Sequence, residues 1–271
     1  MLEATVADGS AVISRGGCMG KRHGKIGPTA RWPLLACTLL LAGATQAAPL
    51  HIMTEQSPPA AMLENNVLTG RETEKIQEMM VRTGTDYSIE ILPWKRAYTM
   101  ALNQNYACVY STSRTPDRDR LFKWVGPIDE ADWVFLGRAD HSFPLRNLED
   151  ARNLRIGTYN GDARDEYLRT RGFHVDPAMN DMVNPQKLLL NRIDLWAVAM
   201  WRESTGISHQ DWSDKIVPLL VFNKVGVYLA CNPAVPDALV ERLNAALADM
   251  KRDGTVVKLE RKYEHWTAPK Q

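Results

Sequence analysis

The chain has 271 residues, with 33 lysines and arginines against 32 aspartates and glutamates, a formal charge of +1, and a hydrophobic fraction of 45%. This length and composition indicate a globular protein that folds as one large domain or as two smaller lobes. The near balance of charge gives no basic excess that would indicate nucleic acid or an anionic membrane as a partner.

The first 47 residues are predicted to be a signal peptide, with Met19 as an alternative start. Basic residues precede an apolar run, 33–44, which is too short to span a membrane. Small residues favour cleavage after Ala47. The remaining chain, 48–271, keeps 28 basic and 30 acidic side chains and a formal charge of −2. We expect it to be a monomer in the periplasm.

The first part of the exported chain alternates between predicted strands and helices. Short apolar runs predict the strands, and apolar positions three and four residues apart predict the helices. The strands are expected at 50–54, 87–92 and 106–111, and the helices at 70–83 and 94–102. This alternation is typical of a parallel sheet with helices packed on it.

The pattern then restarts and predicts a second α/β lobe. The further elements are expected as strands at 133–138, 154–158, 194–200, 216–222 and 225–231, and as helices at 166–171, 185–191, 236–254 and 256–263. We therefore expect one lobe from 48–130 together with 223–271, and another from 131–222. Because ligands in open α/β sheets bind beyond the carboxyl ends of the strands, the two lobes should share a cleft.

The segment 110–128 carries the strongest functional signal. Ser111 and Ser113 lie at the end of a predicted buried strand, and Pro116 can begin a helical turn that contains Arg118. Hydroxyls and exposed amides at a strand end, backed by a guanidinium, form a site for an anion, most naturally a carboxylate. The ordinary alternative is that Arg118 is a solvated helix residue.

This segment resembles the periplasmic solute-binding proteins of the polar amino acid uptake family. The likeness lies in the order of strand, Ser-x-Ser, Thr-Pro-x-Arg, aromatic residue and Gly-Pro, and it extends over the whole exported chain. Shorter matching stretches lie at 54–59, 157–161, 191–194 and 243–263. The resemblance implies an α/β, two-lobed periplasmic-binding-protein (type II) fold. It also implies capture of a small carboxylate-bearing, amino-acid-like solute by lobe closure, for uptake through an ABC permease in the inner membrane.

The resemblance also implies roles for individual residues. In that family, the arginine equivalent to Arg118 pairs with the α-carboxylate of the ligand, helped by the serine equivalent to Ser113. An acidic residue usually holds the α-amino group, but here the matching position falls on Ala199 or close to it. A buried ammonium without a counter-charge would be unfavourable. The sequence therefore leaves the partner of an α-amino group unassigned.

Glu55 and Asp162 are candidates for that missing charge, because both follow predicted strands. Their ordinary interpretations are a solvated loop acid for Glu55 and a helix cap for Asp162. Trp94 follows another strand and could stack on a ligand, with Arg96 as a second anion contact, although Trp94 could equally anchor its helix in the core. Tyr159 is expected to reach the ligand from the second lobe.

Cys108 and Cys231 are the two cysteines of the exported chain. An oxidising compartment favours a disulfide between them. Both lie in apolar runs, where a buried free thiol is the alternative. The sequence leaves both interpretations open.

No catalytic or metal-binding constellation stands out in the sequence. The histidines are scattered, and there is no nucleophile elbow, phosphate loop or Cys-x-x-Cys motif, so we expect no cofactor and a binding protein rather than an enzyme. Two alternatives remain. One is an exported cyclohexadienyl or prephenate-type dehydratase on the same fold, with Asp162 or Glu55 as the acid. The other is an orphan ligand-sensing module.

Overall fold

The computed structural model describes residues 48–141, 143–201, 214–264 and 266, so the predicted signal peptide lies outside the described residues. The strands are β1 (Leu50–Thr54), β2 (Met62–Glu64), β3 (Val67–Thr69), β4 (Tyr87–Ile91), β5 (Ala107–Ser113), β6 (Lys123–Arg138), β7 (Ile156–Tyr159), β8 (Val175–Ala178), β9 (Leu195–Trp201) and β10 (Ile216–Cys231). The helices are α1 (Arg71–Thr83), α2 (Trp94–Asn103), α3 (Ala163–Thr170), α4 (Asn184–Leu189), α5 (Asp237–Arg252) and α6 (Thr255–Arg261). Among the described helices, none is long and apolar enough to cross a membrane.

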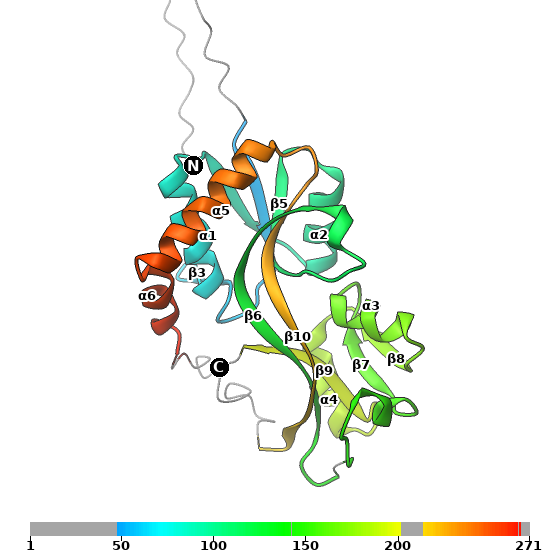
Figure 1. The fold of residues 1–271 in the computed structure, drawn as a ribbon. Coiled ribbons are helices and arrows are strands. Elements are labelled where there is room, and N and C mark those ends of the chain that lie inside the picture. Colours follow the sequence, from blue (N-terminus) through cyan, green and yellow to red (C-terminus); the bar gives the residue numbers. More distant parts are fainter. Residues whose placement is uncertain (1–47, 142, 202–213, 265, 267–271) are drawn as a thin grey trace, which may run out of the picture. The chain divides into compact units, whose positions relative to one another are not determined.

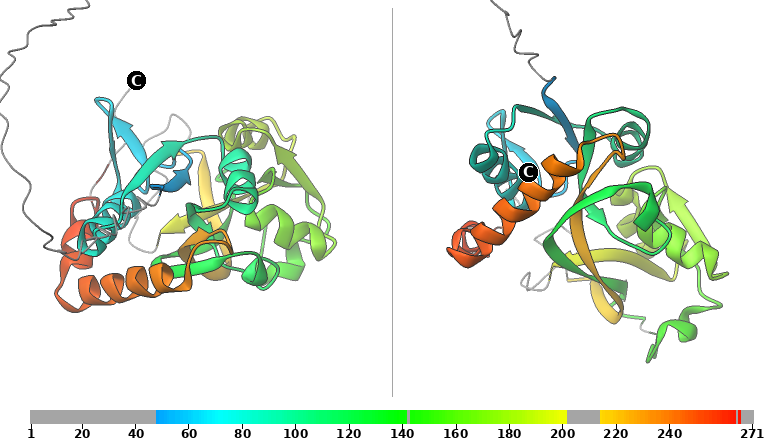
Figure 2. Two further views of the ribbon diagram at one scale, coloured as in Figure 1. Left: turned by 90° about the horizontal axis from the view of Figure 1, so that it is seen from above. Right: turned by 45° about the horizontal axis from the view of Figure 1, so that its top comes forward.

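One mixed sheet of eight strands runs through the molecule in the order β4-β1-β5-β10-β6-β9-β7-β8. The long strands β6 and β10 lie side by side at its centre (Figures 1 and 2). They pair antiparallel with each other, and with β9 and β5 respectively. The parallel arrangement predicted for the first three long strands is confirmed, because β1 is parallel to β4 and to β5. Strand β7 is likewise parallel to β8 and β9.

The two strands predicted at 216–222 and 225–231 are one continuous strand, β10. The polar pair Asn223 and Lys224 between them resembles a turn in the sequence, but both residues pair with β6. The ladder shifts register between Val221 and Asn223, which is a local irregularity rather than a reversal of the chain. Tertiary pairing thus overrides the local turn signal.

The elements fall into two groups along this sheet, which we call the first and the second lobe. The first contains β1, β4 and β5 with α1, α2, α5 and α6. The second contains β7, β8 and β9 with α3 and α4. Strands β6 and β10 run through both lobes (Figure 1).

In the first lobe, alternate residues of each strand enter two different cores, as the period of two requires. Ile52 and Cys108 pack in the core that contains residues of α1 and α5. Their neighbours Met53 and Val109 pack in the core that contains residues of α2. Helices therefore cover both faces of the sheet in this lobe.

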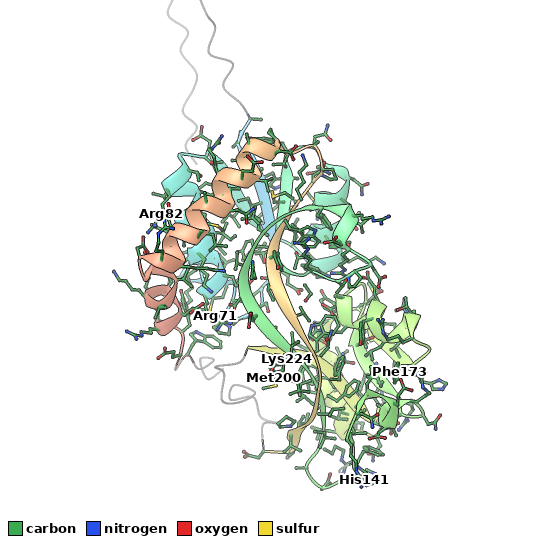
Figure 3. The ribbon with its side chains drawn as sticks, in the orientation of Figure 1. Arg71, Arg82, His141, Phe173, Met200 and Lys224 are labelled. Carbon is green, nitrogen blue, oxygen red and sulfur yellow. A yellow bond between two sulfur atoms is a disulfide. The ribbon has the colours of Figure 1, made fainter. Side chains whose placement is uncertain are left out.

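The second lobe follows the same pattern with a smaller set of residues. Val134 and Trp196 pack with Leu188 of α4, whereas Phe135 packs with Leu168 of α3. Phe173 belongs to the second of these cores and is labelled in Figure 3. The carboxyl ends of β1, β5 and β7 carry the loops that form the candidate site.

Cys108 and Cys231 form a disulfide in the first lobe. They face each other in the ladder between β5 and β10, and both are fully buried. The bond joins residues that are 123 positions apart in the sequence. Of the two interpretations that the sequence left open, the structure contains the disulfide.

Candidate functional site

Arg118 lies just beyond β5 and its side chain is almost completely buried, with the whole residue 1% exposed. Its guanidinium lies over the ring of Tyr98, 4.6 Å from the ring centre. Nε and Nη2 both approach Oε2 of Glu166 in α3, at 2.9 and 2.8 Å. Nη1 is buried and has no hydrogen-bond partner among the described residues. Arg118 is therefore not a solvated helix residue.

A second contact between the lobes forms at the turn before α3. The carbonyl oxygen of Gly161 accepts a hydrogen bond from Nη2 of Arg118 at 3.1 Å, and one from the indole Nε1 of Trp94 at the same distance. Gly161 has a φ of 77°, a left-handed conformation that favours glycine. Trp94 is 2% exposed and belongs to the α2 core. Trp94 therefore anchors α2 in the core, which was the second interpretation of this residue. Its indole also links the two lobes through the hydrogen bond to Gly161.

Acidic side chains gather around this turn. The Tyr159 hydroxyl, at the end of β7, hydrogen-bonds to Glu55, which follows β1. Asp162 caps α3 by accepting from the backbone N–H of Arg164, and it also forms an ion pair with Nε of Arg164 at 2.6 Å. Asp181 accepts hydrogen bonds at 2.9 Å from the Trp196 indole and from the Asn184 amide. Asp162 is therefore a helix cap, which was its ordinary interpretation.

Burial and charge act differently on these acids. Burial raises the pKa of the Glu55 carboxyl to about 8, and the Asp162 carboxylate adds to the rise. Burial also raises the pKa of Asp181. Burial opposes ionisation of Asp162 as well, but Arg164 and Arg118 outweigh it, so the pKa of Asp162 is lowered. The Asp162–Arg164 ion pair thus lies close to the Glu55 carboxyl, which is mostly protonated at neutral pH.

The other predicted ligand residues lie apart from this cluster or have partners elsewhere. Ser111 has a φ of 61° and donates its hydroxyl to Oε2 of the buried Glu72 at 2.7 Å. Ser113 ends β5 opposite Val227 and is partly buried. Arg96 is exposed on α2. Of the eight predicted residues, the structure brings five close together: Glu55, Trp94, Arg118, Tyr159 and Asp162.

Ala199 is partly buried on β9, opposite Trp133 of β6. Trp133 is fully buried, and its Nε1 has no hydrogen-bond partner within the described part of the chain. An indole N–H only donates, so it cannot hold an ammonium group. Neither the Ala199 side chain nor this indole therefore offers an acceptor to an α-amino group.

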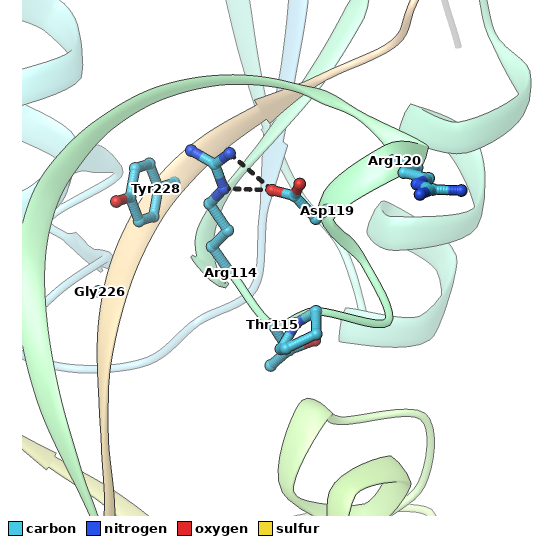
Figure 4. A pocket seen from close by; sticks show the side chains of 7 residues that line it. Arg114, Thr115, Asp119, Arg120, Gly226 and Tyr228 are labelled. Carbon is cyan, nitrogen blue, oxygen red and sulfur yellow. Dashed lines mark hydrogen bonds and ion pairs between the residues drawn. The ribbon is translucent and has the colours of Figure 1, made fainter.

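A pocket of about 550 Å³ opens beside the site segment, lined by residues that include Arg114, Asp119, Arg120 and Tyr228 (Figure 4). The Arg114 guanidinium is paired with Asp119 at 2.6 Å and lies over the rings of Trp124 and Tyr228. None of the eight predicted ligand residues lines this pocket. Because it contains none of those residues, the pocket is not the site that the sequence predicts.

The sequence-based prediction missed Glu166, Arg164 and Asp181. The helix was expected only from 166, whereas α3 begins at Ala163, directly after its cap Asp162. Extending the helix back to that cap would have placed Arg164 and Glu166 in its first turn, at the predicted cleft. Among the described residues, no group of three or more potential ligands could hold a metal ion.

Comparison with solved structures relates this fold to known proteins. A histidine kinase sensor domain with similarity to periplasmic binding proteins matches with a TM-score of 0.69 at 17% identity, over 82% of this chain and 98% of that one. An arginine 3rd transport system periplasmic binding protein from Legionella pneumophila matches with a TM-score of 0.65 at 20% identity, over 79% and 99%. The ancestral amino acid-binding protein AncCDT-1, a precursor of cyclohexadienyl dehydratase, matches with a TM-score of 0.64 at 16% identity, over 79% and 94%.

These likenesses establish the two-lobed periplasmic-binding-protein (type II) fold, and their low identities leave the solute open. No match was found among curated protein sequences. The model of the bacterial extracellular solute-binding proteins, family 3, matches residues 50–265, nearly the whole described chain. The protein therefore belongs to family 3 of the bacterial extracellular solute-binding proteins.

Proposed function

We propose that this protein captures a small, carboxylate-bearing, amino-acid-like solute between its lobes in the periplasm and delivers it to an ABC permease. The signal peptide over 1–47 and the lobe boundaries at 130/131 and 222/223 are part of this proposal. The observation that supports it most is the Arg118 guanidinium, which is buried at the meeting point of the lobes with Nη1 unpaired among the described residues.

The chemistry of that guanidinium favours a carboxylate. Its planar fork matches the two oxygens of a carboxylate, and charge-assisted hydrogen bonds of this kind are about twice as strong as neutral ones. A buried donor left without an acceptor is unfavourable, so an acceptor oxygen of a solute would be stabilising there. The contacts of Trp94 and Tyr159 across the lobes provide the walls that closure requires.

The test is to replace Arg118 and measure binding. A thermal-shift screen of the twenty L-amino acids selects the probe that raises the melting temperature most. Isothermal titration calorimetry should then show that Arg118→Ala weakens binding of this amino acid by about 10- to 100-fold, because a charge-assisted contact is lost.

The matched control is Arg120→Ala, which removes the same charge from an exposed residue two positions away. This variant should bind as the wild type does. Circular dichroism must show that the Arg118 variant is folded, since its side chain is buried. An unchanged dissociation constant in a folded Arg118→Ala protein would contradict the proposal.

Glu55 favours one second candidate function, a dehydratase. A carboxyl with a pKa of about 8 is protonated at neutral pH and can donate a proton to a leaving hydroxyl group. Incubation with prephenate should then release phenylpyruvate, as the protonated hydroxyl leaves as water and the bond to the ring carboxylate breaks to release carbon dioxide. Phenylpyruvate is measured by its absorbance, and Glu55→Gln should abolish its release. Absence of product with the wild type would exclude this candidate and leave the binding function.

A further inference from the structure

An α-amino acid carries two opposite charges, and the site described so far accounts for one of them. Arg118 provides the partner of the carboxylate. The position that usually holds the ammonium in this family falls on Ala199 or close to it, and the buried indole opposite Ala199 is a donor. The acid that binds the ammonium must therefore come from another element.

The Arg118–Glu166 pair links the two lobes through one guanidinium and one carboxylate. The two side chains differ in exposure: Arg118 is 2% exposed, whereas Glu166 is 39% exposed. The Glu166 carboxylate can therefore swing toward solvent, while the guanidinium stays fixed against Tyr98 and Gly161. Glu166 occupies the place on Arg118 that a solute carboxylate would take.

We propose that an α-amino acid inserts between Arg118 and Glu166. Its carboxylate then binds the Arg118 guanidinium, and its ammonium binds the Glu166 carboxylate. This inference rests on the proposed function and assigns the ammonium-binding residue of the same site. One internal ion pair is exchanged for two pairs with the solute, and the charge of the site is conserved. The unpaired Nη1 gives the solute carboxylate a donor that Glu166 does not use.

The other acids near the site fit this role less well. Asp162 already accepts from the side chain and the backbone of Arg164. Asp181 accepts from Trp196 and Asn184. Glu55 is mostly protonated at neutral pH and would have to ionise first. Glu166 is the acid in direct contact with the guanidinium, and an α-ammonium lies next to its own carboxylate.

The exchange predicts a specific dependence on the amino group. A carboxylate without an ammonium must displace Glu166 and gives it no partner in return, so it should bind the wild type weakly. Replacing Glu166 with Gln removes the competing charge and the ammonium partner at once. Affinity for the molecule without its amino group should therefore rise, because it no longer has to displace Glu166. For the amino acid, the lost ammonium contact offsets this gain, so the preference for the amino acid should shrink.

The experiment compares each amino acid that gives a thermal shift with its des-amino analogue, for example L-glutamate with glutarate and L-glutamine with glutaramate. Calorimetry on the wild type should show a preference of about 10- to 100-fold for the amino acid. Glu166→Gln should bind the amino acid and its des-amino analogue about equally. It should also bind glutarate or glutaramate more tightly than the wild type does. Glu166→Asp, which keeps the charge, should retain part of the preference.

The matched control is Glu149→Gln, which removes an acid of the second lobe that pairs with Arg152 away from Arg118. This variant should keep the preference of the wild type. Equal weakening of both molecules in Glu166→Gln, or an unchanged preference, would overturn the inference and leave the proposed function intact. Failure of all twenty amino acids to bind the wild type would instead overturn the proposed function, and the inference with it.

Discussion

Two groups of charged side chains in this protein form ion pairs in different places. The first, which we call the first-lobe network, consists of Arg71, Glu72, Lys75, Asp129 and Glu260. The second is the Arg118–Glu166 pair. In the network, Lys75 contacts Glu260 at 2.6 Å, and Arg71 contacts Asp129 at 2.8 Å. All of its members lie in the first lobe, on α1, α6 and the adjoining part of β6 (Figure 3 labels Arg71).

The difference lies in what each group joins and how far each is buried. The Lys75 side chain is 0% exposed, and its Nζ also donates to the backbone oxygen of Ile128 at 2.8 Å. Glu166 is 39% exposed and meets Arg118 across the two lobes. A network of several partners around a fully buried lysine stabilises one arrangement, whereas a pair with one partly exposed member can exchange partners. The comparison separates charges that stabilise one lobe from a pair that we propose to exchange partners with a solute.

The largest expected effect comes from breaking the network. Lys75→Met should lower the free energy of unfolding by about 3–5 kcal/mol, because Glu260 and Asp129 lose a buried partner. Glu166→Gln in the same urea denaturation experiment should cost no more than about 1 kcal/mol, as expected for a partly exposed pair. Similar losses of unfolding free energy in the two variants would contradict the distinction between the two groups of charges.

A second effect should appear in the dependence of stability on pH. Burial raises the pKa of Glu72 to about 7, and it raises that of Glu55 to about 8. Because the folded protein then holds protons that the unfolded chain releases, stability should fall as pH rises from about 4.5 to 8. Each lost kcal/mol lowers the melting temperature by roughly 2–4 °C in a domain of this size.

Variants of Glu72 and Glu55 should separate the contribution of each acid to this fall in stability. Glu72→Gln should remove the part of the fall that is complete near pH 7, and Glu55→Gln the part that extends to about pH 8. Differential scanning calorimetry at several pH values measures both. A melting temperature that rises from pH 5 to pH 8 in the wild type would contradict this prediction.

The elements with a clear local pattern could be predicted from the sequence. Helix α1 ends at Gly84, whose φ is 59°, and its apolar face enters the core, as the spacing of Ile76, Met79 and Met80 requires. The placement of Arg118 beyond β5 also follows from the local order of strand, serines and Pro116. These features depend on neighbours within a few residues.

Other features could not be predicted locally, because they depend on partners far away in the sequence. Ser111 was expected at the ligand, but its hydroxyl donates to Glu72, which comes from α1. The β2–β3 hairpin turns at Asn65 and Asn66, both with positive φ, and was not anticipated. Strand β10 passes through Asn223 and Lys224 because β6 supplies its hydrogen bonds.

The sequence by itself determined the alternation of strands and helices, the two lobes of the fold and the position of a guanidinium at a strand end. These follow from hydrophobic periodicity and turn chemistry, which act over a few residues. Only the tertiary structure decided that Glu166 meets Arg118 and that Cys108 bonds to Cys231. Each of these contacts joins residues far apart in the chain, and only the paired sheet brings them within reach.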